Sequence, residues 1–265
     1  MAKWLAHLSL ENPVTKSSDR GVRSSTNYKR GWSVLHYCAQ YQGETLMKLV
    51  EKGADYFSKE EMAKWLSQVE TKDANVLLYC ARHHFKTLME LVKYGEVCLS
   101  EEDGMANWLS CVDKSGWSLL HILGLQKEGE PLRELVKYGE RYLQKEQMGK
   151  WLARVNEEGY SVLHFCAANH NQVETLISLL DYGEKYMTPE QREEWLLQRV
   201  KVFGWRVLFM CAENPNGGET LIKLLEYGDK YLPEEELAKW LSHVMDEGIS
   251  TKLRSTFFAR TFERA

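Results

Sequence analysis

Three histidines stand at one position of a recurring sequence pattern, and imidazole is well suited to bind metal or transfer protons near neutral pH. They are His36, His121 and His164, each preceded by leucine. Tyr79 and Phe209 are taken as the residues at the same position in two further copies, and neither carries an imidazole. This replacement favours a structural hydrogen bond within or between repeats over catalysis or metal binding.

Four cysteines also share one position, immediately before alanine: Cys38, Cys80, Cys166 and Cys211. Equivalent positions in stacked helices lie about 10 Å apart, too far for a disulfide, so we expect buried thiols in a reducing compartment. The sequence has no Cys-x-x-Cys pair for zinc and no G-x-S-x-G, H-E-x-x-H or phosphate-binding glycine loop. It therefore predicts no enzymatic activity, no cofactor and no metal.

The recurring pattern is an internal repeat with a period of about 43 residues, in the range of stacked helical repeats. Besides the Leu-His pair, a Trp-Leu pair and a glycine recur in register. The Trp-Leu pair begins at Trp4, Trp65, Trp108, Trp151, Trp195 and Trp240, and the glycine is Gly53, Gly95, Gly139, Gly183 and Gly228. The predicted repeats are 31–73, 74–115, 116–158, 159–203 and 204–247.

Each repeat is expected to hold three helices. In the fourth repeat the first helix follows Ser161, a good N-cap, and the second runs from Glu174 to Gly183, since glycine commonly ends helices. The third opens with a capping box, Ser58-x-x-Glu61 in the first repeat, and carries an apolar stripe that includes Trp65. Length varies between the first and second helices, so stacking would place variable turns along one edge, where binding surfaces are usually built.

The ends of the chain depart from this regularity. Residues 1–10 repeat the pattern of a third helix, and we expect either an N-terminal capping helix or the end of an earlier repeat. Residues 11–30 are rich in polar residues and predict a flexible loop. Residues 248–265 begin another copy and continue as an amphipathic pattern, which predicts a C-terminal capping helix.

The start of each repeat resembles the ankyrin repeat, with its G-x-T-P-L-H-x-A-A turn and helix followed by V-x-x-L-L-x-x-G-A. The first repeat matches best, at Gly31, Ser33, Leu35, His36, Ala39, Leu49, Gly53, Ala54 and Asp55. The ankyrin proline is replaced by valine or leucine, and each repeat is about ten residues longer because the third helix stands where ankyrin has a β-hairpin. The resemblance implies an all-α helical repeat solenoid, ankyrin-like with a third helix per repeat. An armadillo-like or HEAT-like three-helix superhelix is the alternative.

Such a solenoid implies a non-enzymatic scaffold that binds a protein or peptide on its concave face. The ankyrin position after the first glycine is variable and often on the surface, and here it holds a row of aromatic residues, broken only at Asn75. They are Trp32, Trp117, Tyr160 and Trp205, and aromatic residues are favoured interface anchors. The alternative is that the third helix covers them.

The variable turns supply the other predicted partner contacts: His83, His84, Asn169 and His170. The partner is expected to be a protein. Net charge is −4 without a long Lys or Arg run, so the sequence lacks a surface for nucleic acid. It has no apolar run of about 20 residues and no signal peptide core, which predicts no membrane span and a cytoplasmic monomer. A second hypothesis is a targeting or regulatory arm of a larger enzyme, of the effector kind that bacteria deliver into host cytoplasm.

Overall fold

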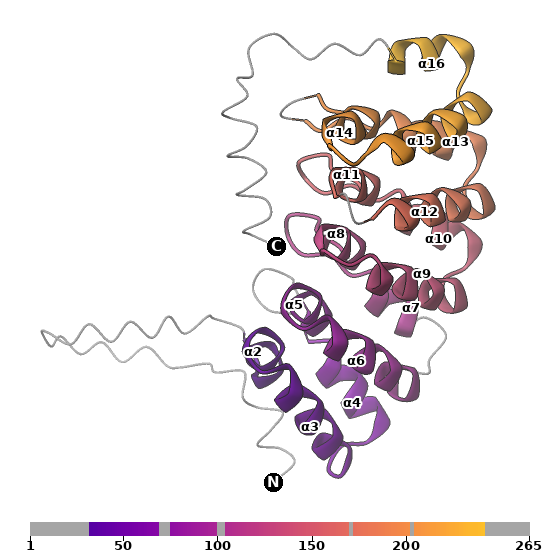
Figure 1. Cartoon of the computed structure of the whole chain (residues 1–265). Coiled ribbons are helices and arrows are strands. Elements are labelled where there is room, and N and C mark those ends of the chain that lie inside the picture. Colours follow the sequence, from indigo (N-terminus) through magenta and orange to yellow (C-terminus); the bar gives the residue numbers. More distant parts are fainter. Residues whose placement is uncertain (1–31, 69–74, 100–103, 170–171, 202–203, 242–265) are drawn as a thin grey trace, which may run out of the picture. The chain divides into compact units, whose positions relative to one another are not determined.

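The computed structural model describes residues 32–68, 75–99, 104–169, 172–201 and 204–241 (Figure 1). These residues form short helices joined by turns, which confirms the all-α prediction. The chain divides into two compact units, Met1–Gly104 and Met105–Ala265. The predictions for residues 1–10, 11–30 and 248–265 lie outside the described residues, as does His170.

Unit one contains the helices of the first predicted repeat and the first two helices of the second. They are α2 (Val34–Tyr41), α3 (Gly43–Ala54), α4 (Lys59–Leu66), α5 (Val76–His83) and α6 (Phe85–Cys98). The two first helices, α2 and α5, pack side by side, and the second helices α3 and α6 do the same. The third helix α4 packs on α6 and α3, and its Trp65 and Leu66 are buried.

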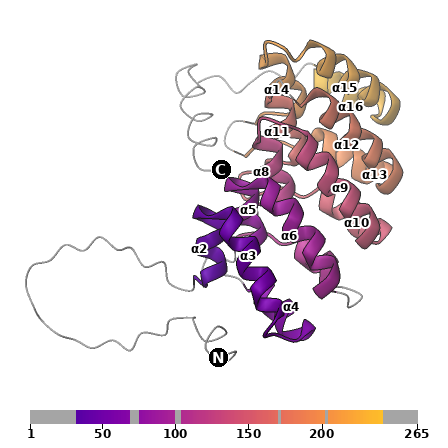
Figure 2. The same cartoon turned by 60° about the horizontal axis from the view of Figure 1, so that its bottom comes forward.

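Unit two contains three further groups of three helices, preceded by α7 (Gly104–Leu109), which begins at the boundary. They are α8 (Leu119–Leu125), α9 (Glu130–Tyr142), α10 (Lys145–Leu152), α11 (Val162–Ala168), α12 (Val173–Tyr186), α13 (Pro189–Leu197), α14 (Val207–Glu213), α15 (Gly218–Tyr231) and α16 (Glu234–Leu241). The first helices α8, α11 and α14 form one row, and the second helices α9, α12 and α15 form the row beside it (Figure 1 and Figure 2). Third helices lie against the second row, α10 on α12 and α13 on α15.

In the first repeat the second helix ends at Ala54, one residue after Gly53, close to the predicted end. In α6, α9, α12 and α15 the helix continues three residues beyond the recurring glycine, and the prediction is wrong there. Gly139 lies inside α9, which continues to Tyr142. A Cβ added at Gly139 would lie only 2.3 Å from Cζ3 of Trp151 on α10. The glycine is therefore required because the tryptophan ring packs directly on the helix backbone, and the two sequence markers are the two halves of one contact.

The start of the first helix corrects the register of the second repeat. The side chain of Asn75 accepts a hydrogen bond from the Leu78 backbone N–H at 3.1 Å, as N-cap residues do. Asn75 therefore occupies the position of the capping serine, and Leu78, not Tyr79, occupies that of the histidine. Asparagine and serine cap helices in the same way, so the helix is kept although the Leu-His pair is lost.

A tight turn precedes the first helix in unit two. Val112 pairs with Ser118, and Val155 with Ser161, each through one isolated antiparallel bridge. Gly159 in the second turn has φ +87°, and a Cβ there would lie 2.6 Å from the Arg199 carbonyl oxygen. Each of these turns is thus held by one antiparallel bridge, and the repeats that contain them also have a third helix.

Candidate protein-interaction surface

The recurring histidines cap helices. Backbone N–H of Ser118 donates to Nδ1 of His121 at 3.0 Å, so the proton of the neutral ring lies on Nε2, which donates to the Arg154 carbonyl oxygen at 3.1 Å. His164 makes the same contact with Ser161 at 3.1 Å. Burial lowers the pKa of both histidines to about 4. Both rings are therefore neutral at pH 7, bonded to the backbone and closed to solvent, which fits the structural interpretation.

The aromatic row is not exposed, contrary to the prediction that it contacts a partner. Trp32, Tyr160 and Trp205 are 6%, 1% and 1% exposed, and Trp117 is half-buried. Aromatic side chains of the first helices pack on the row. Phe165 of α11 is stacked between Trp117 and Tyr160, with ring centroids 5.1 and 5.2 Å apart.

In unit one such a side chain comes from the next first helix. Trp32 meets Tyr79 of α5 with ring centroids 4.7 Å apart. Tyr79, displaced from the histidine position, thus has a packing role of its own. We call the row an aromatic seam. Trp32 and Trp117 pack on the adjacent first helix, and Tyr160 and Trp205 stack on Phe165 and Phe209 of the helix that follows them.

Asn169 is also an internal residue. It is 9% exposed, and its Nδ2 donates to the Gln126 carbonyl oxygen at 2.6 Å, at the end of the preceding first helix. Asn214 repeats the contact one repeat later, donating to the Ala167 carbonyl oxygen at 3.1 Å. These amides satisfy carbonyl groups that every helix end leaves unpaired. The prediction of a partner contact at Asn169 is therefore replaced by a link between repeats.

A second set of links joins the ends of the second helices, at residues outside the predicted sites. Glu140 of α9 accepts from the Tyr186 hydroxyl at 2.7 Å, from the Tyr182 hydroxyl at 3.3 Å and from Lys185. Hydrogen bonding from Lys185, then Tyr186, lowers the pKa of Glu140. Glu184 takes Lys230 of the next repeat at 2.7 Å in the same way. The signal was present as Tyr-Gly-Glu-x-Tyr, of which only the glycine was recognised.

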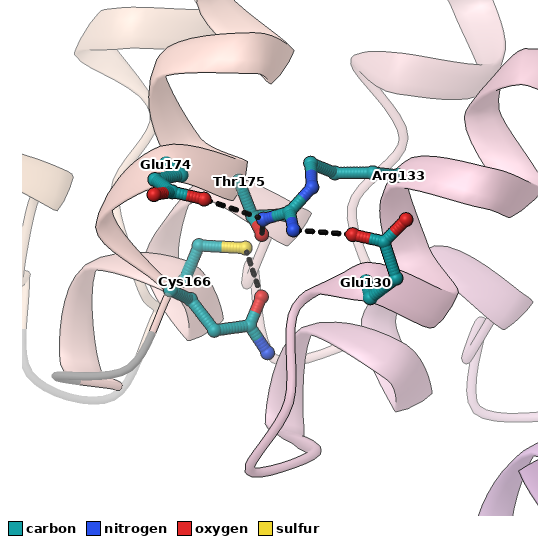
Figure 3. Close-up of polar contacts among 6 residues, drawn as sticks. Glu130, Arg133, Cys166, Glu174 and Thr175 are labelled. Atoms are coloured by element: carbon teal, nitrogen blue, oxygen red, sulfur yellow. Dashed lines mark hydrogen bonds and ion pairs between the residues drawn. The ribbon is translucent and has the colours of Figure 1, made fainter.

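The junction between the starts of α9 and α12 is filled by an arginine. Figure 3 shows Arg133 of α9 lying between Glu130 and Glu174 and pointing at Thr175 of α12. Nη1 donates to the Thr175 hydroxyl at 2.9 Å and lies 3.5 Å from the Glu174 carboxylate. The Arg133 side chain therefore fills this junction of unit two.

The corresponding junction of unit one is open. A hollow of about 540 Å³ lies over the starts of α3 and α6, lined in part by Gly43, Glu44, Lys86 and Thr87. His83 and His84 also line it. His83 is exposed and His84 is half-buried. The structure thus brings these two predicted contact residues together at one concave place on the turns between first and second helices.

The cysteines of the recurring position are free thiols and buried. Burial raises the pKa of Cys211 to about 12 and raises that of Cys80 and Cys166 further. Such thiols stay protonated at neutral pH, which makes them poor nucleophiles and poor metal ligands. Their place between helices fits a packing role.

Two further observations apply to the described ranges alone. No group of three or more metal-binding side chains comes together within these ranges. Nor does any helix there have both the length and the hydropathy that crossing a bilayer requires. A comparison with the models of known protein families and with the curated proteins found no match for this chain.

Proposed function

We propose that this chain is a protein-binding scaffold without catalytic activity, which captures a protein or peptide on the turns between its first and second helices. The observation that carries the proposal is the open hollow over α3 and α6, the place where the sequence predicts variable binding turns. A hollow on rigid helix starts can receive a partner side chain with little reorganisation.

The proposed architecture is a helical repeat solenoid of ankyrin type with a third helix per repeat. Supporting it are the rows of equivalent helices and the bridged turns before the first helices of unit two. The turns also bond to one another, since the Glu157 N–H donates to the Ser115 carbonyl oxygen at 3.0 Å. Stacked turns of this kind fit an ankyrin-like array better than an armadillo-like or HEAT-like one. We propose further that the protein acts as a cytoplasmic monomer.

Blocking the hollow without changing charge tests the proposal. Thr45 is exposed and lines the hollow, so Thr45→Trp would fill it with an indole ring. Ser67→Trp is the matched control, an exposed neutral residue of the same unit at the end of α4. Proteins captured from native lysate by the wild-type chain should be retained by Ser67→Trp and lost by Thr45→Trp. Equal capture by both variants would remove the hollow from the binding surface.

A further inference from the structure

The open hollow of unit one and the closed junction of unit two are built alike. Gly43 and Gly129 stand at the start of their second helices, and an added Cβ would lie 2.7 Å from the Thr87 hydroxyl in one case and 1.9 Å from the Thr175 hydroxyl in the other. Each threonine therefore sits against the preceding helix start in the same way. Gly43 and Thr87 of unit one thus correspond to Gly129 and Thr175 of unit two.

Their charges differ at two positions: the sign is reversed at one, and the charge is absent at the other. Glu174 precedes Thr175, whereas Lys86 precedes Thr87. Arg133 follows Gly129 by four residues, and the residue four after Gly43 is Met47. In unit two an acidic rim holds a cation supplied by the chain itself. In unit one the rim is basic at the same place, and a methionine stands at the position that corresponds to the arginine.

The remaining groups around the hollow increase its preference for negative charge. His83 and His84 line it beside Lys86. The first turns of α3 and α6 carry no side-chain cap, so their N–H groups add positive potential there. Among the described residues that line the hollow, Glu44 is the one opposing charge. It is exposed and placed in the first turn of its own helix, where that turn already stabilises it.

We propose that the hollow over α3 and α6 binds a carboxylate, supplied by an aspartate or glutamate side chain of the protein partner. The inference rests on the proposed function and deepens it, because it gives the chemistry of the group that the turns recognise. Lys86 supplies the ion pair, and the histidines and the threonine hydroxyl supply hydrogen bonds. The contact is the inverse of the Arg133 contact in unit two.

Acetate, with acetamide as its neutral isostere, is the probe. Each is titrated into isotopically labelled full chain at constant ionic strength, and NMR follows the amides of Lys86 and Thr87 and the rings of His83 and His84. Acetate should give saturating shifts and acetamide should not. In Lys86→Glu the apparent Kd for acetate should rise by about ten-fold or more, as loss of a charge-assisted contact predicts.

Lys48→Glu is the control, because Lys48 is an exposed residue of α3 that does not line the hollow and the variant changes net charge equally. It should leave the acetate Kd within about two-fold of wild type. Absence of saturation, or equal affinity in wild type and Lys86→Glu, would overturn the carboxylate assignment. Loss of capture in Thr45→Trp together with no acetate binding would leave the proposed function standing and remove this inference alone.

Discussion

Gly139 and Trp151 make a backbone-to-ring contact so close that a single methyl group on the glycine would lie 2.3 Å from the indole. Equivalent contacts join Gly53 to Trp65, Gly183 to Trp195 and Gly228 to Trp240, with closest Cβ approaches of 2.5, 2.6 and 2.4 Å. Third helices are thus fixed to second helices at one point in each of these repeats. The constant spacing of the two markers follows from this contact.

Alanine at position 139 should destabilise the protein. Overpacking of a rigid site costs about 1–3 kcal/mol, which exceeds the gain of about 1 kcal/mol that glycine-to-alanine gives inside a helix. Gly218→Ala is the control, since nothing lies within 4 Å of a Cβ at that first position of α15. Urea unfolding should show a loss for Gly139→Ala and no loss for Gly218→Ala. If both variants were more stable than wild type, the Trp151 ring would have to move away from the added methyl group at little cost in free energy.

Trp151→Ala should cost roughly 3–5 kcal/mol, because the ring is 1% exposed and leaves a large cavity. The variant also removes the atoms with which a methyl group at position 139 would collide. The penalty of Gly139→Ala should therefore shrink or reverse in the Trp151→Ala background, as residues in contact are not additive. A double-mutant cycle of urea unfolding measures this, and an unchanged penalty would refute the direct contact.

Acid should weaken the fold through the buried histidines. Their pKa is about 4 in the folded chain and 6.5 in the unfolded reference, so between these values the unfolded chain binds more protons. Their contribution to stability is complete above pH 6.5 and declines as pH falls toward 4. Urea midpoints measured from pH 8 to pH 4 should follow this course.

A leucine occupies the histidine position naturally at Leu78, which makes His164→Leu a suitable comparison. The variant should lose part of the decline between pH 6.5 and 4, although its stability at pH 8 is lower because the Ser161 contacts are gone. Hydrogen bonding lowers the pKa of Glu140. The carboxylates are the same in both chains, so their titration contributes to both pH profiles alike. Identical pH profiles would show that His164 is not the titrating group.

The aromatic seam predicts unequal effects for two rings that share one partner. Tyr160 is fully buried and Trp117 half-buried against Phe165. Tyr160→Ala should cost about 3–5 kcal/mol and Trp117→Ala distinctly less. Thermal unfolding with circular dichroism measures both. An unchanged melting temperature for Tyr160→Ala, with weaker partner capture, would return this ring to the binding surface.

The helices could be predicted from sequence because their signals are local. Ser58 accepts from the Glu61 N–H, and the Glu61 carboxylate accepts from the Ser58 N–H, as the spacing indicates. What failed depends on neighbours. Tyr160 stacks on Phe165 of the helix that follows it, and Asn169 bonds to Gln126 one repeat away. The spacing of the markers does not indicate either contact. His83, in contrast, is exposed at the turn between first and second helices, as its position in a variable turn predicts.

The hollow itself could be located but not described in advance. Its position follows from the variable turns, but its openness depends on whether a long side chain such as Arg133 reaches across the junction. The sequence does not show whether a side chain extends that far, and in the first repeat the corresponding residue is Met47. Likewise, the role of Gly139 could not be read from helix-ending rules, because the reason for the glycine lies on a different helix.

The hydrogen bonds that join repeats in unit two each span about one period of the chain. Asn169 reaches back 43 residues to Gln126, and Asn214 reaches back 47 to Ala167. Contacts between adjacent repeats keep the contact order low. Folding can therefore begin in one pair of repeats and extend to the neighbouring repeats. Under mechanical load, the repeats of unit two should unfold one at a time and not in a single cooperative step.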